Sequence, residues 1–438
     1  MQIVIKPGRP LSGSLRLSGD KSLSHRAALF AALADGESVI DNFLVAGVTR
    51  AMLDALSACG VTWVLEGSRL TIQGSGLHGL EPPGIPLNCG NSATTMRMLA
   101  GMLAAAGTPA ILDGSDGLRR RPMGRIVEPL RQMGVPIQAS QGGTAPLRLA
   151  ARSAGQLLTG LDYSLPVASA QVKTCLLLAA LGADRASTLR EPELSRDHSE
   201  RMLAAMGVDV RVEGTQVVLV PPQPARLKAI QMALPGDISA AAFLVVAALI
   251  TPGSELELED VLLNPTRTGL LDALRAMGAE ITLVDVHEEH REPVGQILVR
   301  SSTLHGTEID GSMAIRMIDE FPAFAVAAAY ASGLTLVRGA SELRHKESDR
   351  ITALCSELRR LGIAVEEFPD GFAIHGGNPL SGGVVSSCGD HRLAMALSVA
   401  GLAAEQEVLV EGAEIIAESF PNFVDVMRSL GADASLVA

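Results

Sequence analysis

The chain has 438 residues, more than the ~250–300 residues that one hydrophobic core usually supports, so we expect at least two domains. Its formal net charge of −12 and its small aromatic content (nine Phe, two Tyr and one Trp) argue against a general binder of nucleic acid or of anionic membranes. Any site for an anion must therefore be local.

Cysteine content and hydropathy restrict the class of protein further. The five cysteines are widely separated and include no Cys-x-x-Cys pair, which indicates free thiols in a reducing compartment and no structural zinc. The longest apolar run, residues 240–250, is shorter than the ~18 residues that a membrane-spanning helix needs, and the first residues lack the basic and apolar segments of a secretory signal. We therefore expect a soluble, cytoplasmic protein.

The first segment with a chemical signature is residues 17–26, which read Leu-Ser-Gly-Asp-Lys-Ser-Leu-Ser-His-Arg. Lys21, Ser22 and Arg26 follow a Gly-Asp turn and lead into a helical apolar pattern, so side-chain donors and helix-terminal N–H groups should point at one spot. This combination suits phosphate or carboxylate. A turn followed by a helix cap is the simpler interpretation of the Gly-Asp-x-Ser pattern.

The same Gly-Asp-x-Ser pattern returns at residues 236–239, again before an apolar helical run. We interpret the pair as a two-stranded hinge at residues 18–21 and 235–238. The first domain then comprises residues 21–236. The second comprises residues 1–20 and 237–438, with the segment 2–17 joining it as an edge strand.

Internal repetition predicts the fold class. Six segments show apolar residues at helical spacing, then Leu, Met or Cys, then glycine, then Val, Ile or Ala, which is typical of a helix, its C-terminal cap and a strand. Between the glycines lie strand-like runs and a second, more apolar helix pattern, as at 171–181 and 323–331. We predict an α/β fold of six units, three per domain; a generic α/β protein is the alternative. The capping glycines, 69 to 84 residues apart, are Gly60, Gly134, Gly207, Gly278, Gly362 and Gly431.

Two other patterns do not indicate a site. Residues 74–79 fit G-x-G-x-x-G, but no helix pattern follows, so we predict a turn rather than a dinucleotide site. His287-Glu-Glu-His290 is not a zinc motif, and we expect residues 287–295 to form a loop without metal.

Polar and cationic residues recur at the starts of the apolar helix patterns. Cations at a helix start oppose the helix dipole unless an anion is bound, so we expect a cleft between the domains that holds a multiply anionic ligand. Helix capping explains part of the pattern. The segments are 88–97, 119–122, 169–173, 196–200, 319–320, 344–350 and 390–392.

On these motifs the chain closely resembles the 5-enolpyruvylshikimate-3-phosphate synthase family over essentially its whole length. The matching motifs are Gly19-Asp-Lys-Ser22, Gly90-Asn-x-x-Thr94, Arg121-Pro122, Ser169-Ala-Gln171, Asn264-Pro-Thr-Arg267, Asp319, Lys346-Glu-x-x-Arg350, Asp390-His-Arg392 and Ser419-Phe-Pro421. The resemblance implies the two-domain enolpyruvyl transferase fold, an inside-out α/β barrel with three βαβαββ repeats per domain, which closes around its substrates. The segments 169–173, 196–200 and 264–267 look like marks of the class II branch, whose members tend to tolerate glyphosate.

The resemblance also implies a reaction, transfer of the enolpyruvyl group of phosphoenolpyruvate to the 5-hydroxyl of shikimate 3-phosphate with release of phosphate, and it implies no cofactor and no metal. Catalysis would fall to Asp319 as base, with Glu347 and Lys21 sharing the acid role. Shikimate 3-phosphate would be held by Lys21, Ser22, Arg26, Ser169, Ala170, Gln171, Arg196, Asp319 and Lys346. Phosphoenolpyruvate would be held by Lys21, Asn91, Ala93, Arg121, Gln171, Glu347, Arg350 and Arg392.

The chain departs from the glyphosate-sensitive pattern at three positions: Ala93 replaces a glycine, Glu418 a lysine and Glu342 an asparagine. We expect weak glyphosate binding and a monomer. Two alternatives stay open: the sister transferase acting on UDP-N-acetylglucosamine, which uses a cysteine in a mobile loop, and a non-catalytic repeat scaffold that binds anions. Cys89 is the one cysteine beside a predicted anion site.

Overall fold

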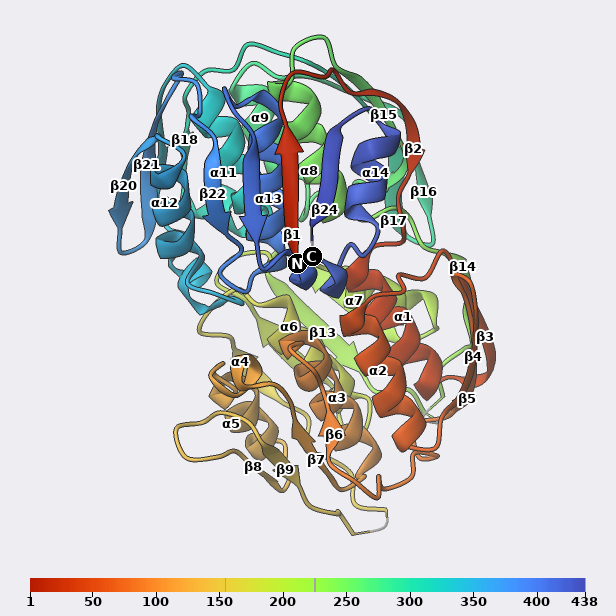
Figure 1. Cartoon of the computed structure of the whole chain (residues 1–438). Helices are drawn as coiled ribbons and strands as arrows, with labels where there is room; N and C mark the ends of the chain where they lie inside the picture. The colour runs from red at the N-terminus through yellow and green to blue at the C-terminus, as the bar shows by residue number, and fades with distance from the viewer. Residues whose placement is uncertain (154, 224–225, 438) are drawn as a thin grey trace. The chain divides into compact units, whose positions relative to one another are not determined.

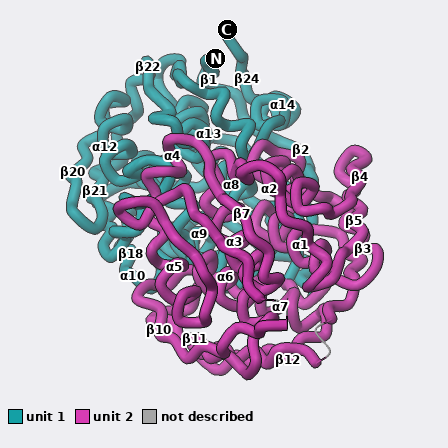
Figure 2. The backbone as a smooth tube through the Cα atoms, turned by 90° about the horizontal axis from the view of Figure 1, so that it is seen from below, with its two compact units in different colours: residues 1–18, 235–289, 293–438 teal, residues 19–234, 290–292 magenta. Residues whose placement is uncertain are grey.

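The computed structural model describes residues 1–153, 155–223 and 226–437. The chain divides into two compact units (Figure 2). Unit 1 comprises residues 1–18, 235–289 and 293–438, and unit 2 comprises residues 19–234 and 290–292. These boundaries differ from the predicted ones by two residues at each of the two predicted hinge segments. They also differ at residues 290–292, which we expected in the second domain and which contact unit 2 through Glu292.

Each unit contains three four-stranded sheets (Figure 1). In every sheet a parallel pair of strands is joined to an antiparallel neighbour. In unit 2 the orders are β14 (Gln231–Ala233), β3 (Asp35–Asp41), β5 (Arg69–Ser75), β4 (Thr62–Glu66); β6 (Leu87–Asn88), β7 (Ala110–Asp113), β9 (Leu147–Leu149), β8 (Ile137–Gln138); and β10 (Asp162–Ser164), β11 (Ser187–Arg190), β13 (Gln216–Val220), β12 (Asp209–Glu213).

The sheets of unit 1 include the first two strands of the chain. Their orders are β16 (Glu280–Glu289), β17 (Glu292–Arg300), β15 (Glu255–Leu262), β2 (Ser12–Arg16); β18 (Glu308–Ile309), β19 (Gly333–Val337), β21 (Gly371–Gly376), β20 (Ala364–Phe368); and β22 (Gly383–Ser386), β23 (Val408–Glu411), β1 (Gln2–Lys6), β24 (Asp433–Val437). The prediction that residues 2–17 form an edge strand holds for β2 but is wrong for β1, which lies between β23 and β24. The predicted loop at 287–295 is also wrong, because β16 and β17 are neighbours that only His290 and Arg291 separate.

Two kinds of helix alternate along the chain. The outer helices are amphipathic and end at the six predicted capping glycines, whose φ values of 83° to 107° confirm the left-handed caps. They are α2 (Gly47–Ala58), α5 (Gly124–Gln132), α7 (His198–Ala205), α9 (Gly269–Ala276), α12 (Arg350–Arg360) and α14 (Phe423–Ser429). Short helices α4 (Asp116–Arg119) and α10 (Gly311–Arg316) and the 3-10 turns η1 (Ser341–His345), η2 (Gly401–Ala403) and η3 (Ala413–Glu418) complete the chain.

The inner helices are buried on nearly every side and lie inside the sheets of their own unit, which makes each unit inside-out. Unit 2 has α1 (Lys21–Leu33), α3 (Ala93–Ala106) and α6 (Ala170–Ala180); unit 1 has α8 (Ile238–Ile250), α11 (Phe321–Tyr330) and α13 (His391–Ala400). They pack closely through small residues: a Cβ atom added to Gly101 of α3 would stand 2.2 Å from the backbone oxygen of Cys175 of α6. Burial on all sides explains why these segments lack a polar face.

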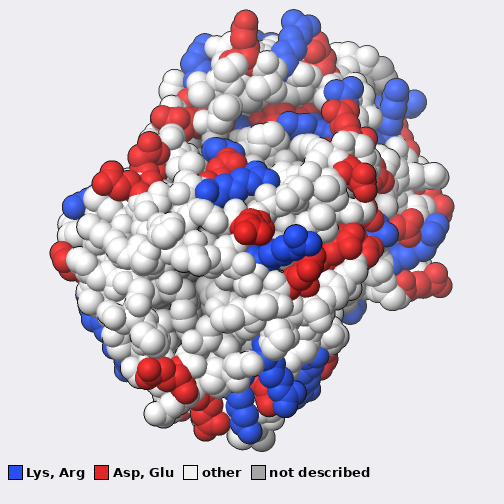
Figure 3. All heavy atoms as spheres, turned by 90° about the horizontal axis from the view of Figure 1, so that it is seen from above, with Lys and Arg blue, Asp and Glu red and all other residues white. Residues whose placement is uncertain are grey.

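The surface carries mixed charge. On the face that Figure 3 shows, Lys and Arg side chains lie beside Asp and Glu side chains rather than in one large basic patch. Throughout the described part of the chain, no helix has the length and apolar character required to span a membrane.

Candidate active site

Many of the predicted site residues lie at the N-terminal ends of the inner helices, while Arg196 precedes the outer helix α7, Arg350 begins the outer helix α12 and Arg121 follows α4. In unit 2, α1 begins at Lys21, α3 at Ala93 and α6 at Ala170; in unit 1, α11 begins at Phe321 and α13 at His391. The free N–H groups and the positive dipole end at such starts favour anions.

The start of α1 is fixed by its own turn. Oδ1 of the buried Asp20 accepts a hydrogen bond from the N–H of Leu23 (2.8 Å), and the hydrogen bond from Ser239 N to Asp237 (2.7 Å) caps α8 in the same way. Both Gly-Asp turns are therefore helix caps. Gly19 is required at the first, because an added Cβ would stand 2.0 Å from the backbone oxygen of Asn42. The turn leaves Lys21 and Ser22 partly exposed.

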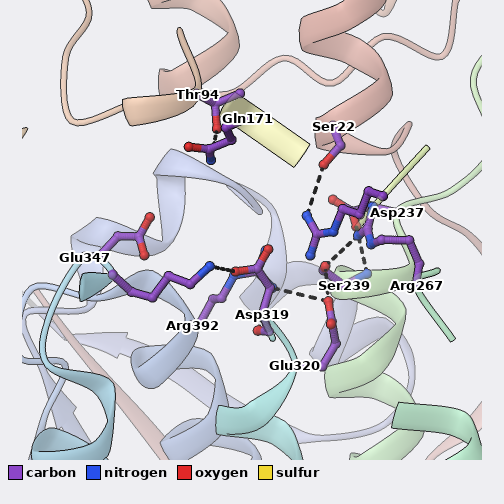
Figure 4. Close-up of polar contacts among 12 residues, drawn as sticks. Ser22, Thr94, Gln171, Asp237, Ser239, Arg267, Asp319, Glu320, Glu347 and Arg392 are labelled. Atoms are coloured by element: carbon purple, nitrogen blue, oxygen red, sulfur yellow. Dashed lines mark hydrogen bonds and ion pairs between the residues drawn. The ribbon is translucent and has the colours of Figure 1, made fainter. Parts of the chain in front are cut away.

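Arg26 and Arg196 differ in how they are placed. Arg26 is only 2% exposed, and its three guanidinium nitrogens donate to Ser199 Oγ (2.8 Å), the backbone oxygen of Ser22 (3.0 Å) and Thr174 Oγ1 (3.0 Å). It thus holds three helices together. Arg196 precedes α7, and its Nη1 donates to Ser22 Oγ at 3.5 Å (Figure 4), which brings two predicted ligands of shikimate 3-phosphate side by side.

The starts of α3 and α6 are linked by Gln171. Its Nε2 donates to Thr94 Oγ1 (2.8 Å; Figure 4), and its Oε1 accepts from Arg97, so the amide has one orientation. Ser169 caps α6 by accepting from Val172 N (3.5 Å). These contacts place the predicted Ser169, Ala170 and Gln171 at one helix start.

Asn91 lies just before α3, and its Oδ1 accepts a hydrogen bond from Ser115 Oγ (2.9 Å). Ser92 caps α3 and accepts from Thr95 N (3.1 Å). Ala93, the first residue of α3, is 2% exposed, so its methyl group is packed against protein. The methyl group by which alanine differs from glycine at this position therefore occupies part of a closely packed space.

The predicted cationic patch at 119–122 is smaller than expected. Arg119 donates to both oxygens of Asp113, from Nε to Oδ1 (2.9 Å) and from Nη2 to Oδ2 (2.7 Å), and this hydrogen bonding lowers the pKa of Asp113. Arg121 is largely buried at the end of α4. Arg119 is thus part of a surface ion pair, because Asp113 at the end of β7 lies close enough to bind it.

In unit 1, Asp319 lies among three cations, of which Figure 4 labels Arg392. Its Oδ1 accepts from Lys346 Nζ (3.2 Å) and Arg350 Nη1 (3.3 Å), and its backbone oxygen accepts from Arg392 Nη1 (3.0 Å). The side chain is 16% exposed. A carboxylate in this setting is oriented and stays within reach of solvent or substrate, as a general base requires.

Arg350 is held more tightly. Its Nε donates to Asp390 Oδ2 (2.7 Å) and its Nη2 to Glu347 Oε2 (2.7 Å). Burial opposes its charge, but the surrounding carboxylates raise its pKa overall. Arg350 therefore stays charged and binds three of the acids that the sequence had singled out.

A second buried network lies behind Arg392, and the sequence did not predict it. Arg267 Nη2 donates to Ser239 Oγ (2.9 Å) and lies 3.7 Å from Asp237 Oδ1, while Ser239 Oγ donates to Glu320 Oε1 (Figure 4). Glu320 Oε1 is 3.9 Å from Arg392 Nη1. The motifs 236–239, 264–267, 319–320 and 390–392 were visible in the sequence, but their pairing depends on tertiary structure.

The cysteines are unsuited to catalysis. Cys89 is buried, and burial together with the charge of Asp113 raises its thiol pKa to about 12. The thiol is therefore neutral near pH 7 and a poor nucleophile. Among the described residues, no three His, Cys, Asp or Glu side chains come together in a way that could hold a metal ion.

Inside-out α/β units, with cations and carboxylates clustered at the starts of the inner helices, define the architecture of the enolpyruvyl transferases. A family model for EPSP synthase (3-phosphoshikimate 1-carboxyvinyltransferase) matches residues 5–427. The chain belongs to the EPSP synthase family.

Known relatives cover almost the whole chain. The 3-phosphoshikimate 1-carboxyvinyltransferase of Syntrophomonas wolfei is 48% identical over 423 residues, which are 96% of this chain and 98% of the relative. That of Pelobacter propionicus is 48% identical over 427 residues, 97% and 98% of the two chains. A solved structure of EPSP synthase from Acinetobacter baumannii is 39% identical and superimposes with a TM-score of 0.88, covering 100% of both chains.

Proposed function

We propose that the chain transfers the enolpyruvyl group of phosphoenolpyruvate to the 5-hydroxyl of shikimate 3-phosphate and releases phosphate, as a 3-phosphoshikimate 1-carboxyvinyltransferase of the shikimate pathway. The main support for this proposal is the setting of Asp319, a partly exposed carboxylate among Lys346, Arg350 and Arg392 in a member of the EPSP synthase family. Phosphate and carboxylate groups on two substrates require several cations, and each charge-assisted hydrogen bond contributes about 1.5–3 kcal/mol.

Residues of unit 2 are assigned chiefly to binding. Arg196 and Ser22, 3.5 Å apart, take the phosphate of shikimate 3-phosphate together with Ser169, and Gln171 contacts both substrates. Asn91, Ala93 and Arg121 serve phosphoenolpyruvate. Arg26 acts by holding Ser22, Thr174 and Ser199 in place, since its nitrogens already donate to these groups.

Residues of unit 1 are assigned to chemistry as well as binding. Asp319 removes the proton of the 5-hydroxyl as the hydroxyl oxygen adds to phosphoenolpyruvate. Glu347, together with Lys21 of unit 2, delivers a proton to the methylene carbon. The C–O bond to phosphate then breaks, and the added proton leaves the methyl group, which restores the double bond. Arg350 and Arg392 neutralise the charge of phosphoenolpyruvate.

The finer assignments are part of the same proposal. Ala93, where glyphosate-sensitive members carry glycine, supports a class II-like enzyme that binds glyphosate weakly. Free cysteines, four of them buried, support a cytoplasmic enzyme, and we propose that it acts as a monomer.

The test is release of phosphate from phosphoenolpyruvate that depends on shikimate 3-phosphate. Release only with this acceptor supports the proposal, and release with UDP-N-acetylglucosamine instead would assign the chain to the sister reaction. Binding of both substrates without turnover would leave a scaffold that binds anions.

A further inference from the structure

A buried ionic triad in unit 2 lies outside the chemistry described above. Lys173 Nζ is 2.6 Å from Glu191 Oε2 and 2.7 Å from Glu200 Oε1, and the side chains of all three residues are 4% exposed or less. None of the three is needed to contact a substrate or to move a proton. Their role must come from what they connect.

The triad joins three segments of unit 2. Lys173 lies on α6, one helical turn after Ser169, to whose backbone oxygen its N–H donates (2.9 Å). Glu191 directly follows β11, and Glu200 lies in the first turn of α7. The lysine therefore ties the start of α6 to the loop after β11 and to the start of α7.

Glu191 also closes the loop that leads to Arg196. Ser195 Oγ donates to Glu191 Oε1, and Ser195 N donates to Oε2 at 3.4 Å. Arg196 is the next residue. Its backbone is thus fixed on one side by the Ser195 contact with Glu191 and on the other by α7, which Glu200 anchors.

A second set of contacts runs parallel to the first. Thr174 Oγ1 and Ser199 Oγ, each the neighbour of a charged member of the triad, lie 2.6 Å apart, and Arg26 of α1 donates to both. The same surfaces of α6 and α7 are therefore held by a hydroxyl pair beside the ionic contacts.

Stability alone does not account for the triad. Burying one lysine with two carboxylates carries a large desolvation penalty, and apolar replacement of such a group is often neutral or stabilising. Burial raises the pKa of Glu200 in spite of Lys173, while the two carboxylates raise the pKa of Lys173 in spite of its burial. A group of charges with so large a desolvation penalty is best explained by the geometry that it imposes.

We propose that Lys173, Glu191 and Glu200 are positioning residues for shikimate 3-phosphate. They hold Arg196 beside Ser22, and they hold the start of α6, in the arrangement that binds the phosphate group. The assignment rests on the proposed function. It predicts a stronger effect on shikimate 3-phosphate than on phosphoenolpyruvate, since Gln171 is the one residue assigned to phosphoenolpyruvate that lies on a segment held by the triad.

The principal test is the triple variant Lys173→Met, Glu191→Gln, Glu200→Gln, which removes every charge together and leaves none unpaired in the interior. The expected result is a rise of about tenfold or more in both KM and the dissociation constant for shikimate 3-phosphate, with kcat and KM for phosphoenolpyruvate within about twofold of the parent. Phosphate release and calorimetric titration measure these quantities. Unchanged binding in a folded triple variant would overturn the proposal.

A matched control separates positioning from general damage. Leu203→Ala creates a cavity on α7 and removes no charge, because Leu203 is a fully buried apolar residue. It should lower the unfolding midpoint and leave KM for shikimate 3-phosphate near the parent value. An equal rise in KM in this control would reduce the triad to a structural element and contradict the proposal.

A milder variant tests the proposal if the triple variant does not fold. Ser195→Ala removes only the loop contact to Glu191, so KM for shikimate 3-phosphate should rise while the unfolding midpoint stays close to the parent, and Ser195→Thr should restore KM. No rise in Ser195→Ala would count against the triad. A parent that neither binds nor turns over shikimate 3-phosphate overturns the proposed function and this assignment together; a working parent isolates the triad.

Discussion

Arg350 and Asp390 form a buried ion pair in which Arg350 Nε lies 2.7 Å from Asp390 Oδ2, with the side chains 1% and 0% exposed. The same aspartate caps α13, because its Oδ1 accepts a hydrogen bond from Arg392 N (2.9 Å). Burial acts to raise the pKa of Asp390, but Arg350 outweighs it and lowers the pKa overall. One carboxylate thus fixes two arginines assigned to phosphoenolpyruvate.

We predict that Asp390→Leu lowers the free energy of unfolding by about 3–5 kcal/mol, because it leaves the Arg350 charge buried without this partner. Glu255→Gln is the control. Glu255 pairs with Arg300, both are 64% exposed, and loss of such a pair changes stability by about 0–1 kcal/mol. Denaturant titration of both variants measures the difference, and equal effects would contradict the assigned importance of burial.

Asp319→Asn should lower kcat by about 10²–10⁴-fold and leave the dissociation constant of shikimate 3-phosphate within a small factor of the parent. The amide keeps the size of the side chain but cannot accept a proton as a base does. The comparison is Asp310→Asn, an exposed helix cap in the same unit whose replacement retains a capping side chain. A kcat for Asp319→Asn equal to that of Asp310→Asn would remove Asp319 from the base role.

Ala93→Gly should strengthen inhibition by glyphosate by about 5-fold to 150-fold, the equivalent of relieving 1–3 kcal/mol of overpacking. Glyphosate is longer than phosphoenolpyruvate between its anionic ends, so a methyl group at the start of α3 should crowd the inhibitor more than the substrate. Inhibition constants at fixed shikimate 3-phosphate measure the effect. KM for phosphoenolpyruvate should change little, and equal inhibition of parent and variant would refute the steric explanation.

Cys89→Ser should retain near-parental kcat. The buried thiol, with its pKa raised to about 12, is not a nucleophile near neutral pH. The measurement is phosphate release under identical substrate concentrations, with Cys59→Ser as a second buried thiol for comparison. Selective loss of turnover in Cys89→Ser would instead support the cysteine-dependent reaction of the sister transferase.

His25 should make the protein less stable in mild acid. Burial lowers its pKa from 6.5 to about 4, and its Nδ1 donates to the backbone oxygen of Lys21 (2.8 Å). Between these two pH values the unfolded chain binds a proton that the folded chain does not, so stability falls as pH falls, by about 3 kcal/mol in all. His25→Gln should flatten the profile between pH 6.5 and 4, whereas the exposed His375→Gln should not; identical profiles for His25→Gln and the parent would refute this source of acid sensitivity.

Local features of the fold could be predicted from the sequence. The six glycine caps follow from helical periodicity and from the rarity of positive φ in other residues, so they need no knowledge of distant contacts. The inner position of β1 could not be predicted, because it depends on pairing with residues 408–411 and 433–437. The hairpin of β16 and β17 was missed because residues 287–292 at its end are all polar or charged, which is the composition of a loop.

The candidate site shows the same division. Cations at helix starts, such as Lys21 and Arg196, could be predicted from the sequence because helix termini can be predicted from it. The partners that orient them, including Asp390 and the pair of Glu191 with Ser195, are brought together by packing between elements far apart in the chain. Periodicity carries no signal for such pairs.

The place of β1 in its sheet has a consequence for how the polypeptide is made. Its partners β23 and β24 lie about 400 residues further along the chain, so β1 cannot pair in this sheet until those residues have been synthesised. Residues 19–234 have no such dependence on the C-terminal end and can begin to fold while translation continues. Loss of β1 or of β24 from this sheet therefore exposes an unpaired strand edge, and nascent chains that lack β23 and β24 should be the ones that proteases and chaperones capture.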